Sequence, residues 1–403
     1  MMLKETLRAV VRKQRETIDT MDCGAEREEL NSIDMNSTHA IIISGIRRCG
    51  KSTLLRQLMR KAKKRYYFNF EDPNTMNFEL TDFQKLDDIF HEEYGECEYY
   101  FFDEIQNINK WEIFVRALLD KKKKCIITGS NASLLSQELG TRLTGRHIRY
   151  ELYPFSFNEM QSLTRKEKNI EAFEDYLNKG GFPEYIQEQK TEILQHLFGD
   201  IIARDIAVRH KIRETKTLKE MAIYLLSNTG REFSYNQLKK TFELGSTNSA
   251  ITFVSFFEDS YLLFTLPKFD YSLKKQAVNP KKAYSIDNGL SNANSVLFSS
   301  DRGRMLENLA FIHLRRKYKE LYYFKENREC DFLIRQKGKI TQAIQVCFTL
   351  DEDNKKREIE GLTEAMNKFA LKKGIIITYN QEDTLEIESK EIRIIPAWKY
   401  ITQ

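Results

Sequence analysis

The chain has 403 residues, of which 41% are hydrophobic and 31% charged, and its formal net charge is +5 at pH 7. This length exceeds one ordinary domain and predicts roughly two to four. The sequence contains no apolar run long enough to cross a bilayer, and its N-terminus does not read as a signal peptide, so we expect a cytoplasmic protein without a membrane partner. The mild positive charge permits a local contact with nucleic acid but does not by itself indicate one.

The cysteines and histidines do not indicate a metal site or a disulfide framework. No C-x-x-C pair occurs, and the six histidines are scattered. We therefore expect reduced thiols, as in a cytoplasmic protein. The cysteines are Cys23, Cys49, Cys97, Cys125, Cys330 and Cys347.

The first 152 residues alternate between predicted helices and strands. Apolar residues at helical spacing predict an amphipathic helix over residues 3–19, and an apolar run predicts a buried strand at 40–43. Strands alternating with helices favour a parallel sheet covered on both faces, and ligands gather at the carboxyl ends of such strands. Further strands are predicted at 66–70, 99–102, 125–128 and 148–152, and helices at 53–59, 83–94 and 111–119.

A phosphate-binding loop comes directly after the first strand. Residues 45–53 read Gly-Ile-Arg-Arg-Cys-Gly-Lys-Ser-Thr, a complete G-x-x-x-x-G-K-[ST] pattern that opens a helix. In such a loop the backbone N–H groups cradle phosphate oxygens, the lysine contacts the β- and γ-phosphates, and the serine hydroxyl binds Mg²⁺. The sequence therefore predicts ATP and Mg²⁺ as ligands of Gly45, Ile46, Arg47, Arg48, Cys49, Gly50, Lys51, Ser52 and Thr53.

Two carboxylates end the strand at 99–102 and complete the predicted site. Asp103 is expected to support Mg²⁺ together with Ser52. Glu104 is the candidate base that orients the water attacking the γ-phosphate. A strand end of this kind also occurs without function, and it is the upstream loop that favours the catalytic interpretation.

Four polar residues further along extend this candidate site. Ser130 and Asn131 come after the strand at 125–128, where either side chain would reach the γ-phosphate or its attacking water, or would cap the next helix. Arg142 and Arg146 are candidates for a charge that completes the transition state from a neighbouring copy of the chain. Simple surface arginines remain the alternative.

The second half of the chain begins with helices and then changes character twice. After Pro154 the pattern is helical, with an interruption at residues 180–184. Helices at 218–227, 236–242 and 248–258 followed by an apolar strand at 261–266 have the order of a winged helix-turn-helix. The last part is predicted to mix helices at 307–318 and 355–369 with strands at 321–324, 331–335, 343–349 and 374–379.

With these motifs assembled, the chain resembles prokaryotic AAA+ (P-loop) ATPases that carry a C-terminal DUF4143 domain. The resemblance implies an α/β protein: a parallel-sheet P-loop AAA+ core, a helical and winged-helix middle, and a C-terminal α/β domain similar to restriction endonucleases. The expected segments are an N-terminal helix and linker (1–36), the ATPase core (37–160), a helical lid or linker (161–216), a winged-helix-like domain (217–275) and the endonuclease-like domain (276–403). The supporting motifs are Gly45–Thr53, Phe102–Gln106 with Trp111, Thr128–Asn131, Leu143–Arg146, Leu152–Phe157, Gly180–Glu184, Arg204–Ile206, Tyr284–Leu290, Glu307-Asn308, Glu329–Phe332 and Ile344–Cys347.

The C-terminal resemblance implies a nuclease site that has degenerated. Glu307 and Asp331 match the acidic positions that would hold Mg²⁺. The next strand, however, reads Gln345-Val346-Cys347 where an active enzyme of this pattern would show Glu-x-Lys. We therefore expect a retained fold used for binding, without cleavage.

Two functions remain open from the sequence. The first is a Mg²⁺-dependent ATPase whose nucleotide state repositions the C-terminal domains, with double-stranded DNA as a candidate partner and a homo-oligomer as a candidate assembly. The second is a nucleotide-dependent switch or scaffold that binds protein partners with little turnover. The predicted groove-facing helix at 248–258 has almost no cations, which weakens the DNA interpretation. A basic footprint would have to come from Lys239, Lys240, Lys274, Lys275, Lys281 and Lys282.

Overall fold

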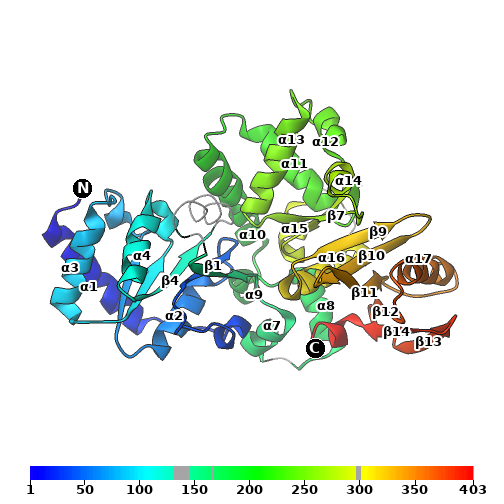
Figure 1. The fold of residues 1–403 in the computed structure, drawn as a ribbon, viewed down its shortest axis with the longest axis horizontal. Coiled ribbons are helices and arrows are strands. Elements are labelled where there is room, and N and C mark those ends of the chain that lie inside the picture. The colour runs from blue at the N-terminus through cyan, green and yellow to red at the C-terminus, as the bar shows by residue number, and fades with distance from the viewer. Residues whose placement is uncertain (131–142, 144, 166, 296–300, 403) are drawn as a thin grey trace. The chain divides into compact units, whose positions relative to one another are not determined.

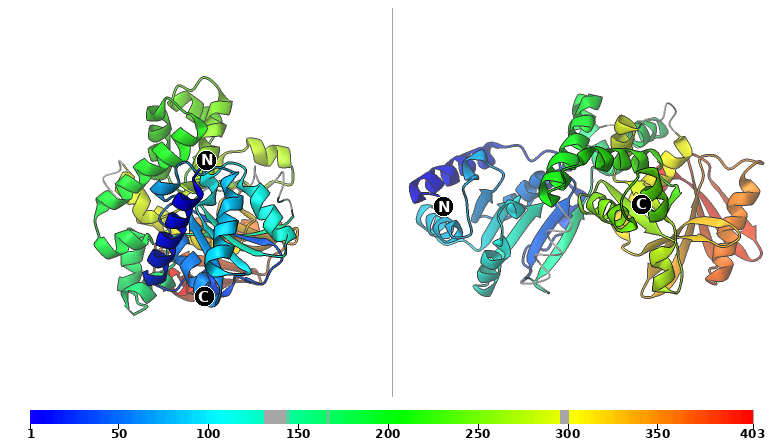
Figure 2. Two further views of the ribbon diagram at one scale, coloured as in Figure 1. Left: turned by 90° about the vertical axis from the view of Figure 1, so that its left-hand side faces the viewer. Right: turned by 90° about the horizontal axis from the view of Figure 1, so that it is seen from above.

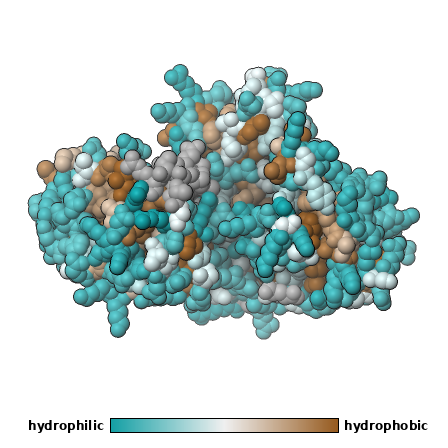
Figure 3. Space-filling model, viewed as in Figure 1, coloured by the Kyte–Doolittle hydropathy of each residue, from teal (hydrophilic) through white to brown (hydrophobic). Residues whose placement is uncertain are grey.

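The computed structural model describes residues 1–130, 143, 145–165, 167–295 and 301–402. The chain forms two compact units, Met1–Tyr153 and Pro154–Gln403 (Figure 1). Asn131 and Arg142 lie outside the described residues. In the part of the chain that is described, no helix combines the length and the apolar character needed to span a bilayer. The face shown in Figure 3 is mainly hydrophilic, with apolar side chains in separate patches.

The first unit is built on a five-stranded parallel sheet. Its strand order is β2-β3-β4-β1-β5, with every neighbouring pair parallel. The crossover connections place the carboxyl ends of all five strands at one edge, as expected for a sheet whose strands alternate with helices. This confirms the predicted parallel-sheet core. The strands are β1 (Ala40–Gly45), β2 (Arg65–Asn69), β3 (Tyr99–Asp103), β4 (Lys124–Gly129) and β5 (His147–Leu152).

Helices cover both faces of this sheet (Figures 1 and 2). Alternate strand residues such as Tyr66, Phe68, Tyr100 and Phe102 pack into one core with apolar residues of α1, α3 and α4, whereas α2 packs on the opposite face. Leu7 of α1 is fully buried in that core, so the predicted N-terminal helix packs within the first unit. The helices are α1 (Lys4–Thr20), α2 (Lys51–Lys61), α3 (Asp82–Tyr94) and α4 (Trp111–Asp120), with short 3₁₀ turns η1 (Glu28–Asn31), η2 (Pro73–Thr75) and η3 (Ile105–Asn107).

The second unit begins with a group of helices, as predicted from the pattern after Pro154. The first, α7, starts with a capping box in which Ser156 and Glu159 satisfy each other's backbone N–H groups. The predicted interruption at 180–184 is the bend between α8 and α9. The helices are α7 (Phe157–Thr164), α8 (Ile170–Lys179), α9 (Pro183–Glu188) and α10 (Thr191–Asp200), which continues into the π-helical η4 (Ile201–Val208).

A three-stranded antiparallel sheet with its helices comes next in the chain. Its strand order is β6-β8-β7, and β8 pairs along its length with β7. The boundary predicted between residues 275 and 276 cuts this hairpin and is therefore wrong, because β8 belongs to the same sheet as β7. The elements are α11 (Thr215–Ser227), β6 (Glu232–Phe233), α12 (Tyr235–Thr241), α13 (Thr247–Asp259), β7 (Leu263–Pro267), α14 (Leu273–Val278) and β8 (Lys281–Ser285).

The C-terminal part is a six-stranded mixed sheet with order β13-β14-β12-β11-β10-β9. Strands β11, β12 and β14 run parallel, and the remaining neighbours pair antiparallel. Residues of α17 such as Leu362 and Met366 share a buried core with Leu333 of β10 and Ile376 of β12. The α/β class is thus confirmed in both units. The elements are α15 (Asn288–Asn294), α16 (Arg302–Lys317), β9 (Leu321–Lys325), β10 (Glu329–Gln336), β11 (Lys339–Val346), α17 (Lys355–Lys368), β12 (Lys373–Thr378), β13 (Asp383–Ile387), β14 (Lys390–Pro396) and α18 (Ala397–Tyr400).

Candidate active site

The loop between β1 and α2 has the backbone that its glycines permit. Gly50, immediately before α2, has φ +99°, which side-chain-bearing residues rarely adopt. At Gly45 a Cβ atom would lie 2.1 Å from the carbonyl oxygen of Leu152 on β5, far inside contact distance. The loop is therefore held tightly against the sheet, with the N-terminus of α2 directly behind it.

Lys51 is buried beneath this loop. Its ammonium donates to the carbonyl oxygens of Gly45 and Ile46, both at 3.2 Å, and lies 3.5 Å from Glu104 Oε1. Only 4% of the residue is exposed. Burial disfavours the charged form, but the surrounding groups, Glu104 first among them and Asp103 included, together more than offset this effect, and the pKa of Lys51 lies above its usual value. The side chain thus presents a fixed positive charge at the predicted phosphate site.

Asp103 ends β3 among hydroxyl groups. The Thr128 hydroxyl of β4 donates to Asp103 Oδ1, and the Ser52 hydroxyl also hydrogen-bonds this carboxylate. Burial and the neighbouring Glu104 charge raise the pKa of Asp103 to about 6, while the two hydroxyls oppose that rise. The oxygen atoms of Ser52 and Asp103 therefore meet at one point, and oxygen ligands of this kind suit Mg²⁺.

Glu104 has an unusual backbone and a crowded carboxylate. Its φ is +52°, and its N–H donates to the Thr128 hydroxyl at 2.9 Å. Gln106 donates to Glu104 Oε2 and lies 3.4 Å from the Ser130 hydroxyl. Burial disfavours the ionised carboxylate, but Lys51 and Gln106 hold the pKa of Glu104 below its usual value. Glu104 is therefore ionised at neutral pH.

The remaining predicted loop residues support the loop or lie at its rim. Cys49 is buried and its thiol donates to the carbonyl oxygen of Leu152 at 3.5 Å, and Ile46 is also buried. Arg47 pairs with Glu71 at 3.0 Å. Arg48 has φ +62°, and Thr53 accepts a hydrogen bond from Arg56 at 3.2 Å.

Of the two predicted arginines, the one within the described residues is not brought to this site. Arg146 is half-exposed and forms an ion pair with Asp120. Arg142, like Asn131, lies outside the described part of the chain. Their assignment to catalysis stays a prediction.

Arg27 is a structural support that the sequence reasoning missed. It is fully buried, and its guanidinium donates to the carbonyl oxygens of Cys49 at 2.7 Å and of Tyr153 at 2.8 Å. One side chain thus fastens the phosphate loop to the chain that leaves β5. No local signal marked Arg27, because it stands in a polar stretch and its partners are distant in sequence.

The predicted nuclease residues also lie together, but around a lysine. Lys282 of β8 is 3% exposed, and its ammonium lies 3.1 Å from Glu307 and from Asp331 and 2.7 Å from Glu329. The expectation that Lys282 belongs to an exposed basic footprint is therefore wrong. In the described residues, no group of three or more histidine, cysteine or acidic side chains is arranged to hold a metal ion. All six cysteines are free and buried.

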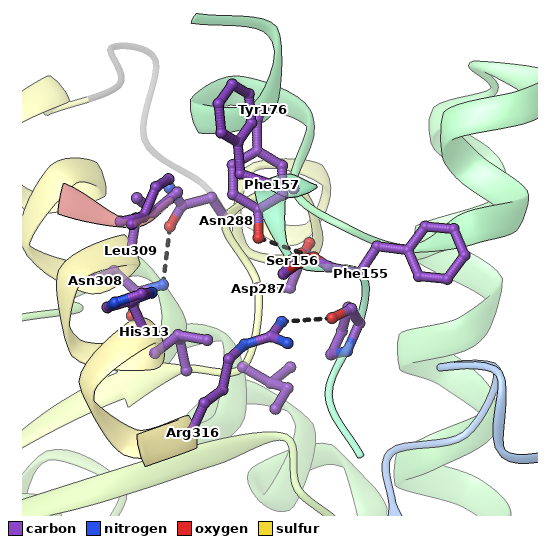
Figure 4. A pocket seen from close by; sticks show the side chains of 15 residues that line it. Phe155, Ser156, Phe157, Tyr176, Asp287, Asn288, Asn308, Leu309, His313 and Arg316 are labelled. Carbon is purple, nitrogen blue, oxygen red and sulfur yellow. Dashed lines mark hydrogen bonds between the residues drawn. The ribbon is translucent and has the colours of Figure 1, made fainter. Parts of the chain in front are cut away.

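Several sequence motifs meet at a small pocket in the second unit (Figure 4). Asp287 accepts hydrogen bonds from the N–H groups of Gly181 at 2.6 Å and Leu290 at 3.0 Å, and burial raises its pKa to about 6. Asn308 donates to Asn288 at 2.8 Å. The space that the pocket offers to water molecules is about 30 Å³, compared with the roughly 10–15 Å³ that a single water needs. We interpret these motifs as a packing junction, because the space is too small for a nucleotide.

Comparison with known proteins agrees with the domain types found in the sequence. The model of an AAA domain matches residues 37–161, a domain of unknown function (DUF8612) matches 170–301, and the DUF4143 domain of unknown function matches 302–400. The chain is similar in part to the structure of AMPPCP-bound DnaA from Aquifex aeolicus, at 15% identity and a TM-score of 0.31, covering 62% of this chain and 88% of that one.

Two similar proteins extend along nearly the whole chain. The uncharacterized protein MJ1544 of Methanocaldococcus jannaschii is 35% identical over 391 residues, covering 89% of this chain and 87% of its own length. An uncharacterized protein of Haemophilus influenzae is 28% identical over 383 residues, covering 89% and 93%. The chain therefore belongs to the family of proteins that combine an AAA domain with a C-terminal DUF4143 domain.

Proposed function

We propose that the first unit binds ATP with Mg²⁺ and hydrolyses it. The observation that carries this proposal is the meeting of Lys51, Asp103 and Glu104 within one buried cluster at the carboxyl edge of the sheet. A lysine charge, a hydroxyl–carboxylate pair and an ionised second carboxylate are the parts that phosphoryl transfer to water requires.

Each residue of the cluster has a distinct role in this proposal. The loop N–H groups and Lys51 bind the β- and γ-phosphates and stabilise the charge that develops on them. Ser52 and Asp103 hold Mg²⁺, which neutralises phosphate charge when bound. Glu104 accepts a hydrogen bond from the attacking water and orients it, and Gln106 and Thr128 keep Glu104 in place.

We also propose that the nucleotide state is passed to the second unit through the end of β5. Three contacts link the phosphate loop to this strand end. Gly45 and Cys49 both lie against the Leu152 carbonyl, and the Arg27 guanidinium connects the Cys49 carbonyl to the Tyr153 carbonyl. Residue 153 is where the first unit ends. A shift of the loop backbone would therefore displace the chain that enters the second unit. This displacement would reposition the domains of that unit.

For the second unit we propose a helical linker, a winged-helix-like module over residues 215–285 and a nuclease-like C-terminal domain. Double-stranded DNA is the candidate ligand of the module. Lys239 and Lys281 are partly buried and Lys282 is buried, so the exposed lysines of the predicted footprint are Lys240, Lys274 and Lys275. Binding to DNA should then weaken with salt, with a slope of about −0.9 per phosphate contacted. Absence of binding at low salt, or binding insensitive to salt, would contradict this part.

Steady-state ATP hydrolysis by the full chain tests the main proposal. Lys51→Ala should abolish nucleotide binding, and Glu104→Gln should bind ATP normally while turnover falls by roughly two to three orders of magnitude. A Glu104→Gln protein that turns over at the wild-type rate would remove the assigned base. Tight ATP binding with negligible turnover in the wild type would instead support the alternative, a nucleotide-dependent switch that binds protein partners.

A further inference from the structure

The buried ammonium of Lys282 stands at the centre of the nuclease-like acidic cluster, which is separate from the proposed ATPase site. Lys282 extends from β8, Glu307 from α16, and Glu329 and Asp331 from β10. The ammonium contacts all three carboxylates at 2.7–3.1 Å. Burial disfavours the charged lysine, but the surrounding carboxylates hold its pKa well above the usual value. The cluster therefore contains its own permanent cation.

Two of the carboxylates that contact Lys282 have further partners within the protein. Glu307 Oε1 also accepts the Tyr284 hydroxyl at 2.6 Å, and Tyr284 is itself buried and stacked on Phe311. Asp331 Oδ2 accepts the N–H of Val346 at 3.0 Å. Glu307 and Asp331 therefore each accept a hydrogen bond from an O–H or N–H donor of the protein in addition to their contact with Lys282.

Gln345, which replaces an expected glutamate, fits this arrangement. Its Oε1 accepts the Asp331 N–H at 3.2 Å, and its Nε2 donates to Glu358 Oε2 at 2.7 Å. A glutamate at this position would place two buried carboxylates against each other, where like charges repel. Glu358 therefore favours an amide over a carboxylate at position 345, and this amide contributes no negative charge to a metal site.

These contacts do not fit Mg²⁺. That ion requires oxygen ligands at about 2.0–2.1 Å in near-octahedral geometry. Here Glu307 Oε1 and Asp331 Oδ1 surround a nitrogen at 3.1 Å each, and a divalent ion between them would lie against the Lys282 charge. Lys282 is only 3% exposed, so its ammonium is enclosed by protein at this position.

We propose that the Lys282 ammonium permanently occupies the cation position of this cluster, so that the C-terminal domain neither binds a divalent metal there nor cleaves phosphodiesters with one. The lysine instead fastens β8 of the three-stranded sheet to α16 and β10. Removing its charge should expose the carboxylates and create a divalent-ion site that the wild type does not have.

The test is a Mn²⁺ titration of the full chain without nucleotide, in which electron paramagnetic resonance counts the ions bound. The variants are wild type, Glu307→Gln, Lys282→Met, and Lys282→Met combined with Asp331→Asn as the matched control. Any ion bound weakly near Asp103 contributes equally to all four. We expect equal stoichiometry in the wild type and Glu307→Gln, one further ion per chain in Lys282→Met, and loss of that ion in the double variant.

Two results would overturn the proposal. One is a Mn²⁺ ion bound by the wild type and lost in Glu307→Gln, and this comparison stands even where Lys282→Met fails to fold. The other is a folded Lys282→Met protein that binds no additional ion. Nicking of supercoiled plasmid provides an independent readout: Mn²⁺-dependent cleavage by the wild type that Asp331→Asn abolishes would also refute it.

Discussion

Thr128 is the residue on which the geometry of both carboxylates in the candidate active site depends. Its buried hydroxyl donates to Asp103 Oδ1 and accepts the Glu104 N–H at 2.9 Å. The second bond holds Glu104 at φ +52°, a region that is unfavourable for a residue with a side chain. Thr128→Val keeps the branched shape and removes only the hydroxyl, so it isolates this function.

The expected cost comes from the two bonds lost. A buried N–H left without a partner costs about 1–3 kcal/mol. For a unit of this size each kcal/mol lowers Tm by roughly 2–4 °C. Loss of the hydroxyl also removes a bond that favours ionised Asp103, so its pKa should rise above about 6. Misplacement of the base by an ångström reduces turnover by up to about 100-fold.

Steady-state ATP hydrolysis and fluorescent-nucleotide binding separate these effects. We expect Thr128→Val to bind ATP with an affinity close to wild type while kcat falls roughly 10–100-fold. Thr128→Ser is the matched control, because it keeps the hydroxyl and loses only a methyl group, worth about 1 kcal/mol of stability. Wild-type kcat in Thr128→Val, or equally slow turnover in Thr128→Ser, would refute the reasoning.

Three further predictions concern the same unit. Since Asp103 must be ionised to support Mg²⁺ and its pKa is about 6, kcat/KM for ATP should fall as the pH drops through about 6. The control is Asp287→Asn, which removes a second carboxyl with a pKa of about 6 and should leave this fall in kcat/KM unchanged. A wild-type kcat/KM that does not fall at acidic pH would contradict the assignment of Asp103. A lysine in Arg27→Lys cannot reach the carbonyls of both Cys49 and Tyr153, so Tm should fall by roughly 4–8 °C and ATP affinity should weaken. Calorimetry that shows an unchanged Tm, together with a titration that shows unchanged ATP affinity, would disprove the supporting role of Arg27. Gly45→Ala should lose at least about tenfold in ATP affinity, because its Cβ would lie 2.1 Å from a backbone oxygen. The control is Gly199→Ala, whose Cβ meets nothing within 4 Å and which should change neither affinity nor stability by more than about 1 kcal/mol. Equal ATP binding by both variants would count against the tight packing of the loop.

The parts of the candidate site that could be predicted are those encoded locally. The phosphate loop requires glycines at fixed spacing, and Asp103 and Glu104 come after an apolar run, so strand order alone brings them to one edge. The parallel sheet was predictable for the same reason, because each buried strand reads as a continuous apolar run.

The parts that could not be predicted depend on contacts between distant residues. Lys282 lies 25 residues from Glu307 and 49 from Asp331, and beside Lys281 it reads as part of a solvated basic run. Arg27 lies 126 residues from Tyr153. The misplaced domain boundary has a related cause, since α14 carries exposed polar residues between β7 and β8 and resembles a linker.

The two lysine–carboxylate clusters of this chain show how the number of ammonium contacts decides what a buried acidic site can bind. Lys51 contacts one carboxylate, at 3.5 Å, and shares its remaining bonds with backbone carbonyls. Asp103 is therefore left to hydroxyl groups, which are themselves suitable neighbours for Mg²⁺. Lys282 instead contacts three carboxylates at 2.7–3.1 Å. The same residue types thus leave one cluster open to a metal–nucleotide complex and close the other, because in the second the lysine supplies the cation itself.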